Sequence, residues 1–193
     1  MSVYKSLKWI DGQVNPSGIK TRVFFAPKTF IATHPKVIAL PITASDFVTL
    51  AGDFVMAVGK TFYELYSTQG KGKVEWEPIG EKDHKMFINK GSFSFPDISD
   101  DVKAVAKSLI NSNVVLVALL PHETEFRAVV IGEEDWDTTV TLKGTSGDAP
   151  GSAKGLSFDI EAPSVTPLPS YKGAIVTPEG TYDCETGVFT PTP

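Results

Sequence analysis

The sequence predicts a mainly β (α+β) fold: a β-sandwich or barrel-like domain with one flanking α-helix and a long protruding hairpin or loop. Three observations support this prediction. Short runs rich in Val, Ile, Thr and aromatic residues alternate with Gly- and Pro-containing turns along most of the chain. One stretch, residues 97–113, has helical periodicity instead. The 193 residues suffice for one substantial core but not for two.

The helix is predicted from DISDDVKAVAKSLINSN, residues 97–113, where apolar residues recur on one helical face. Asp97 or Ser99 can cap its start by accepting hydrogen bonds from free backbone N–H groups. The run that follows, VVLVALL from Val114 to Leu120, is apolar throughout. It predicts a strand that is buried on both faces.

The chain before residue 67 predicts an arm followed by short strands. Residues 1–20 contain Asp-Gly and Pro-Ser-Gly turn signals and indicate an arm or a first hairpin. TRVFFAPKTFIAT and KVIALP are strand candidates, and their prolines favour sheet edges or strand ends. Helix and strand are both compatible with residues 46–67, but the glycines and the Phe, Val, Thr and Tyr content favour two strands, at 54–58 and 61–67.

Residues 67–92 form a long stretch with four glycines around short alternating segments such as KVEWEPI. The stretch predicts a mobile loop or an extended hairpin that stands off the body. Its residues Lys71, Trp76 and Phe87 are candidate inter-subunit contacts. Trp76 with the later phenylalanines is compatible with an exposed aromatic platform for sugars or a partner, although a half-buried hairpin face is the commoner explanation.

The last third predicts three more strands and an irregular end. One strand lies around 139–142, a flexible loop at 144–155, a strand with one wet face at LSFDIEA, and a short strand at YKGAIV. The sequence TPEGTYDCETGVFTPTP is typical of a loose hairpin with a tail. We therefore expect a single β-rich domain with an N-terminal arm over residues 1–176 and a proline-rich C-terminal tail over 177–193.

The charge is unevenly distributed. The formal net charge is −5, and residues 133–193 carry 3 Lys and Arg against 10 Asp and Glu. Proteins that bind nucleic acid through its phosphates need clustered basic residues, so the acidic last third argues against such binding. It is compatible with a surface that repels nucleic acid. No apolar run approaches about 18 residues, and no secretory signal is evident, so no membrane span is expected.

The chain offers few groups for chemistry. Gly59-Lys60-Thr61 lacks the spacing of a phosphate-binding P-loop, and a turn is expected there. The single Cys184 excludes a disulfide framework and a multi-cysteine zinc site. The three histidines are scattered, which favours solvated loop positions. We expect no catalytic residue, no metal and no cofactor.

Four carboxylates form the densest polar cluster, at Glu133, Glu134, Asp135 and Asp137. Such a cluster is compatible with binding of a hard cation or with acid-dependent glycoside hydrolysis. A solvated acidic surface is the favoured interpretation, because the cluster lacks the ligand order and turn glycine of a calcium loop.

The run from Val115 to Ile175 contains a strand ending in VIG, a GTSGDAP loop, a GLSFDIE strand and a late Tyr-Lys-Gly. In pattern and order, residues 70–175 resemble the tail tube (major tail) proteins of long-tailed bacteriophages. The resemblance implies a β-sandwich with a helix at its flank, six copies closing into a ring, and rings stacking into a tube. It assigns 97–113 to the flanking helix, 67–92 to an element that reaches a neighbouring ring, and both termini to arms.

We therefore expect a non-enzymatic virion structural protein, made in the host cytoplasm, that assembles with itself and with other tail proteins. DNA passes its acidic surface without specific binding. A capsid-decorating or receptor-binding β domain that uses Trp76 and Trp136 is the alternative. An acid-dependent hydrolase is a third hypothesis, and it needs two carboxylates that face each other across a cleft.

Overall fold

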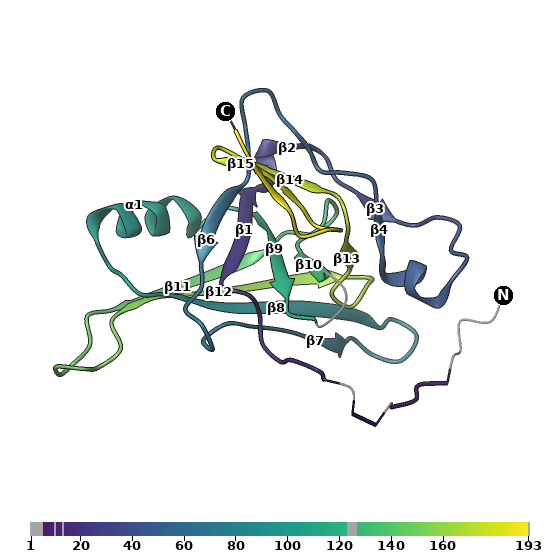
Figure 1. Cartoon of the computed structure of the whole chain (residues 1–193), viewed down its shortest axis with the longest axis horizontal. Helices are drawn as coiled ribbons and strands as arrows, with labels where there is room; N and C mark the ends of the chain where they lie inside the picture. The colour runs from purple at the N-terminus through teal and green to yellow at the C-terminus, as the bar shows by residue number, and fades with distance from the viewer. Residues whose placement is uncertain (1–5, 10, 13, 123–126, 193) are drawn as a thin grey trace.

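The computed structural model describes residues 6–9, 11–12, 14–122 and 127–192. Within these residues the chain forms sixteen strands, one α-helix and two short 3-10 helices (Figure 1). All the strand ladders are antiparallel. The predicted mainly β fold with a single α-helix is confirmed.

A five-stranded middle sheet organises the body, in the order β13-β10-β9-β1-β6. Its strands are β1 (Arg22–Pro27), β6 (Tyr63–Tyr66), β9 (Val114–Leu120), β10 (Arg127–Ile131) and β13 (Ser170–Tyr171). The central strand β9 is buried at every residue from Val114 to Leu119. The prediction that this run is buried on both faces is confirmed, because packed layers cover both sides of the middle sheet.

A four-stranded outer sheet covers one face of the middle sheet, in the order β11-β12-β8-β7. Its strands are β7 (Lys73–Ile79), β8 (Met86–Phe95), β11 (Thr139–Thr145) and β12 (Gly155–Ser164). The two sheets share a first core that includes Leu116, Ile131, Phe93, Phe158 and Ile160. Strand β12 buries alternate residues, as its sequence predicts, and leaves Glu161 exposed.

A third layer covers the opposite face of the middle sheet. It consists of β14 (Ala174–Thr177), β15 (Gly180–Asp183) and β16 (Phe189–Pro191), which form the C-terminal sheet. Shorter elements complete the layer: η1 (Lys28–Phe30), β2 (Ile31–Thr33), β3 (Lys36–Val37), η2 (Ala44–Val48), β4 (Leu50–Ala51) and β5 (Val55–Met56). Side chains from this layer and the middle sheet form a second core, which includes Phe24, Phe62, Ile175 and Cys184.

The hairpin predicted after Thr177 is present as strands β15 and β16, but it is packed and not loose. Tyr182 and Cys184 are buried in the second core, so this segment is packed. Gly180 makes the pairing possible, because a Cβ atom there would lie 2.3 Å from the carbonyl oxygen of Thr190. In this segment proline and glycine lie at the ends of short paired strands, whereas the sequence indicated a loose structure.

Helix α1 (Asp100–Leu109) lies where it was predicted but is shorter than residues 97–113. Ser99 occupies the N-cap position, and its carbonyl accepts the first helical hydrogen bond, from the N–H of Lys103 at 3.0 Å. Leu109 is the helix residue that is buried, in the first core, whereas Val105 is 47% exposed. The helix therefore flanks the sandwich and covers little of it (Figure 1).

The expected stand-off hairpin at 67–92 is placed differently. Strands β7 and β8 do form a hairpin, but β8 is an inner strand that pairs with β12 from Phe87 to Phe95. A Cβ atom on Gly91 would lie 2.7 Å from the ring of Phe93, so this glycine permits close packing and is no sign of a loop.

Two other segments project from the body in Figure 1. One is the end of the β11–β12 hairpin with its loop at 146–154. The other is the N-terminal arm, which we define as the described residues of 6–18. Among the described residues, the first backbone hydrogen bond from the N-terminus joins the N–H of Lys20 to the carbonyl of Leu119, at 2.7 Å.

Candidate functional site

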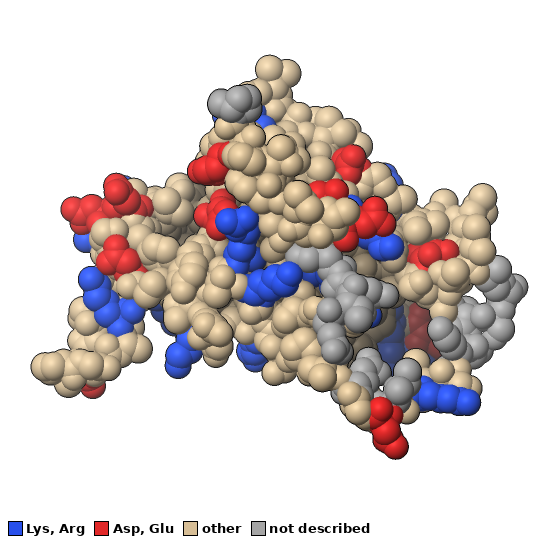
Figure 2. All heavy atoms as spheres, viewed as in Figure 1, with Lys and Arg blue, Asp and Glu red and all other residues tan. Residues whose placement is uncertain are grey.

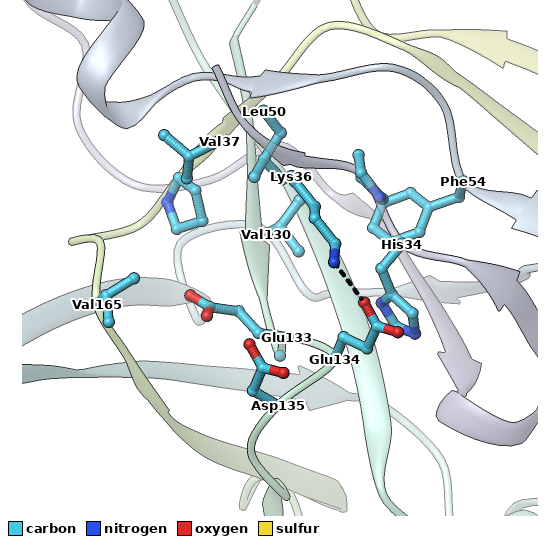
Figure 3. A pocket seen from close by; sticks show the side chains of 13 residues that line it. His34, Lys36, Val37, Leu50, Phe54, Val130, Glu133, Glu134, Asp135 and Val165 are labelled. Carbon is cyan, nitrogen blue, oxygen red and sulfur yellow. Dashed lines mark ion pairs between the residues drawn. The ribbon is translucent and has the colours of Figure 1, made fainter. Parts of the chain in front are cut away.

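The acidic segment 133–137 begins where strand β10 ends. Gly132 has a φ of +107°, a region that favours glycine, and a Cβ atom there would lie 3.0 Å from the carbonyl oxygen of Val114. The chain turns at this residue and presents Glu133, Glu134 and Asp135 to a cavity of about 210 Å³ (Figure 3). The cavity lies between this turn, the β3 and β4 strands and the segment around 165–169.

Glu133 is the half-buried member of the cluster. Its Oε1 atom accepts a short hydrogen bond from the hydroxyl of Ser164, which also lies 2.7 Å from the carbonyl oxygen of Thr166. Burial raises the pKa of Glu133, and the bond from Ser164 opposes that rise. Because a serine hydroxyl has one proton, protonated Glu133 can donate to Ser164 while Ser164 donates to Thr166.

His34 and Lys36 enter the same cavity from a segment about a hundred residues away in sequence (Figure 3). His34 is 9% exposed and contacts the ring of Phe54 edge-on, with centroids 5.9 Å apart. Burial lowers the pKa of His34, and the nearby Glu134 partly opposes this. Lys36 Nζ lies 3.4 Å from Glu134 Oε2, and exposure of both side chains makes this ion pair weak.

Asp137 points away from the cavity residues toward the start of β9. Its Oδ1 accepts a hydrogen bond of 2.7 Å from Asn113 and lies 3.7 Å from Lys28 Nζ. Three of the four predicted acidic residues thus have polar or charged partners, and Asp135 is exposed. Among the described residues no group of three or more His, Cys, Asp or Glu side chains could hold a metal ion.

The candidate contacts on the β7–β8 hairpin are partly brought together. Trp76 and Phe87 form an edge-to-face pair with centroids 5.5 Å apart, and Trp76 is 51% exposed. They share the inward-facing side of the outer sheet with Val74, which packs against the first core. Lys71 lies in the exposed turn before β7.

An apolar groove lies between helix α1 and the edge of the middle sheet. Its volume is about 660 Å³, and its walls include Phe25, Tyr63 and Leu65 from the sheet and Val102 and Val105 from the helix. Sequence reasoning missed this groove. The available signal was the apolar face of the predicted helix, which includes Val102 and Val105.

Strand β6 forms one rim of the apolar groove. It is an edge strand: one side pairs with β1, and the other side pairs with no described strand. An unpaired edge presents free backbone N–H and C=O groups, which can pair with another extended chain.

No family model matches the chain, and no curated protein or solved structure is significantly similar to it. No helix in the described part of the chain has the length and apolar character needed to cross a membrane. The relation to tail tube proteins therefore stays a prediction from sequence pattern.

Proposed function

We propose that this protein is a virion structural protein, a tail tube subunit. Six copies close into a ring, and rings stack into a tube through which DNA passes. The proposal combines the pattern of residues 70–175 with surfaces of the molecule that suit contact with further copies.

Exposed apolar side chains on segments that leave the body carry the proposal. On the N-terminal arm Leu7 is 96% and Trp9 64% exposed, and on the segment before η2 Leu40 is 85% and Ile42 74% exposed. Single exposed apolar residues are ordinary, but extended segments that display several of them are typical of surfaces covered by a partner. Assembly into rings would bury them and would also pair the free sheet edges.

The outward face of the outer sheet is the surface we assign to the channel. It carries Glu75, Glu77, Asp159 and Glu161, and two of its lysines, Lys73 and Lys90, are paired with carboxylates, whereas the exposed Lys143 has no ion pair with a described residue. Lys73 Nζ lies 2.9 Å from Glu75 Oε2, and Lys90 pairs with Glu77. Because two of the lysines on this wall are paired with carboxylates, the wall offers phosphates no clustered positive charge to bind, and DNA can slide past it.

The test is the assembly state of the purified protein. We expect light scattering after size-exclusion chromatography to show oligomers that grow with protein concentration, and negative-stain microscopy to show rings or tubes. DNA added at physiological salt should not co-elute with them. Compact monomers under every salt condition would rule the proposal out.

The exposed Trp76 favours one alternative, a capsid-decorating or receptor-binding β domain. A half-exposed tryptophan held by an edge-to-face contact with Phe87 is a ready platform for a sugar or a protein side chain. Binding to a glycan array or to capsids that is lost in Trp76→Ala would favour this alternative, and binding that persists would remove it.

A further inference from the structure

The apolar groove between helix α1 and strand β6 has no occupant within its own subunit. Its walls leave Val105 47% and Tyr63 41% exposed, and its volume of about 660 Å³ lies in the range of specific binding sites. We propose that the N-terminal arm of a second copy of this chain fills the groove by adding a strand to the free edge of β6. The inference deepens the proposed function and rests on it.

The alternation of side chains on the arm suits this placement. Neighbouring residues of an extended chain point to opposite faces, so Leu7 and Trp9 share one face. Tyr63 and Leu65 share the groove face of β6 in the same way. An arm paired with β6 therefore directs Leu7 and Trp9 together into the groove.

The charges of arm and groove are complementary. Two acidic residues border the groove. Asp101 lies on the helix wall, and Glu64 borders the groove through the backbone of β6, with its side chain on the opposite face and 2.9 Å from Arg22 Nε. Figure 2 shows acidic side chains over helix α1. Residues 1–9 carry Lys5 and Lys8 and no acidic residue. In the paired arrangement Lys8 lies on the same face of the sheet as Glu64, because both point away from the groove. Like charges would oppose docking, and these opposite charges favour it.

The arm is free to leave its own subunit. Among the described residues of 6–18, none makes a hydrogen bond or an ion pair. In Figure 1 the arm departs on the side of the body opposite helix α1. Thirteen extended residues span at most about 45 Å, enough to reach a neighbouring subunit. Each subunit then has one arm and one groove, and such head-to-tail contacts generate rings when the rotation closes.

Two full-length variants separate the partners of this contact. The double variant Leu7→Ser and Trp9→Ser keeps the groove but loses the arm's apolar side chains. Val105→Lys keeps the arm but places a cation inside the groove, where docking of Leu7 and Trp9 would bury it without a partner. We expect each variant alone to associate at least about tenfold more weakly than the wild type, because a few buried apolar anchors dominate such contacts.

Mixing the two variants gives the decisive result. The intact arm of the Val105→Lys chain can enter the intact groove of the Leu7→Ser, Trp9→Ser chain, and no further junction can form. Sedimentation velocity should therefore show two monomeric samples that yield heterodimers when combined. If the groove held the arm of its own subunit, or an unrelated protein, mixing the two variants would give no heterodimer. A mixture that stays monomeric therefore overturns the inference.

Matched controls guard against unfolding and general loss of apolar surface. Ile110→Lys changes a residue that is 56% exposed at the end of the same helix but does not line the groove. Val58→Ser with Val188→Ser removes two exposed valines elsewhere. Both controls should assemble like the wild type. Wild-type rings that persist in both test variants overturn the arm contact and leave the proposed function standing, whereas a monomeric wild type overturns both.

Discussion

Strand β9 and helix α1 are adjacent in sequence and each has an apolar face, yet they contribute differently to the fold. All six residues from Val114 to Leu119 of β9 are buried, whereas α1 buries Leu109 and leaves Val105 half exposed. The difference arises from their neighbours. Sheets cover both faces of β9, but only the rim of the sandwich contacts the helix. An apolar stripe thus predicts a contact surface and does not say whether its partner lies in the same chain.

The largest expected effect is that of Leu116→Ala in β9. Leu116 is fully buried in the first core, so its truncation removes apolar contacts and leaves a cavity. We expect a loss of about 3–4 kcal/mol in the free energy of unfolding. Urea denaturation with an unchanged m-value would show it, and a loss below about 1 kcal/mol would contradict the central position of β9.

Leu109→Ala should have an intermediate effect. Leu109 is 5% exposed and is the contact through which α1 joins the first core. Its truncation should cost about 2 kcal/mol, partly offset by the good helix propensity of alanine. The same urea titration measures this loss. A cost equal to that of Leu116→Ala would mean that the helix belongs to the core as fully as β9 does.

Val105→Ala should change the monomer's stability by less than about 0.5 kcal/mol, because the side chain is half exposed and alanine favours the helix. If the apolar groove is filled in the assembly, the same substitution should lower the stability of the oligomer by more than that of the monomer. Thermal unfolding at low and high protein concentration separates the two cases.

The smallest effects concern two carboxyl groups whose pH dependences have opposite signs. Burial raises the pKa of Glu133 above its ordinary value of 4.5, so its stabilising contribution is fully present below pH 4.5 and is lost as the pH rises through the folded-state pKa. Near the start of α1, hydrogen bonds from Ser99 and Ile98 lower the pKa of Asp97. Its contribution is present above its ordinary value of 3.8 and is lost as the pH falls through the folded-state pKa.

Melting temperatures measured across pH distinguish these carboxyl groups. The melting temperature of the wild type less that of Glu133→Gln should decline as the pH rises above 4.5. The melting temperature of the wild type less that of Asp97→Asn should decline as the pH falls into the acid range. Parallel pH curves for Glu133→Gln and the wild type would show that burial does not perturb this group.

The sequence predicted what depends on periodicity within one element. The uniform apolar run of β9, the alternation of β12 and the helical face of α1 each identify their element, because side-chain spacing follows directly from backbone geometry. It failed where the outcome depends on neighbours. Gly91 was interpreted as a loop glycine, but it lies in a paired strand against the ring of Phe93. The hairpin predicted after Thr177 is packed into the second core and is not loose.

The candidate site was less predictable than the fold. The acidic cluster was visible in the sequence, but nothing in its spacing indicated that His34 and Lys36 would share its cavity, or that Glu133 would turn toward Ser164. Such contacts join residues far apart in the chain, and they follow from the order of strands in the sheets. Local pattern contains no information about that order.

The one cysteine of the chain is buried in the second core beneath the C-terminal sheet, and burial raises the pKa of its thiol to about 12. Only the thiolate reacts readily with alkylating reagents, so the folded protein should resist labelling. Modification of Cys184 then requires the C-terminal sheet to lift away. The rate at which Cys184 is alkylated therefore measures how often the C-terminal sheet detaches, and no engineered probe is needed.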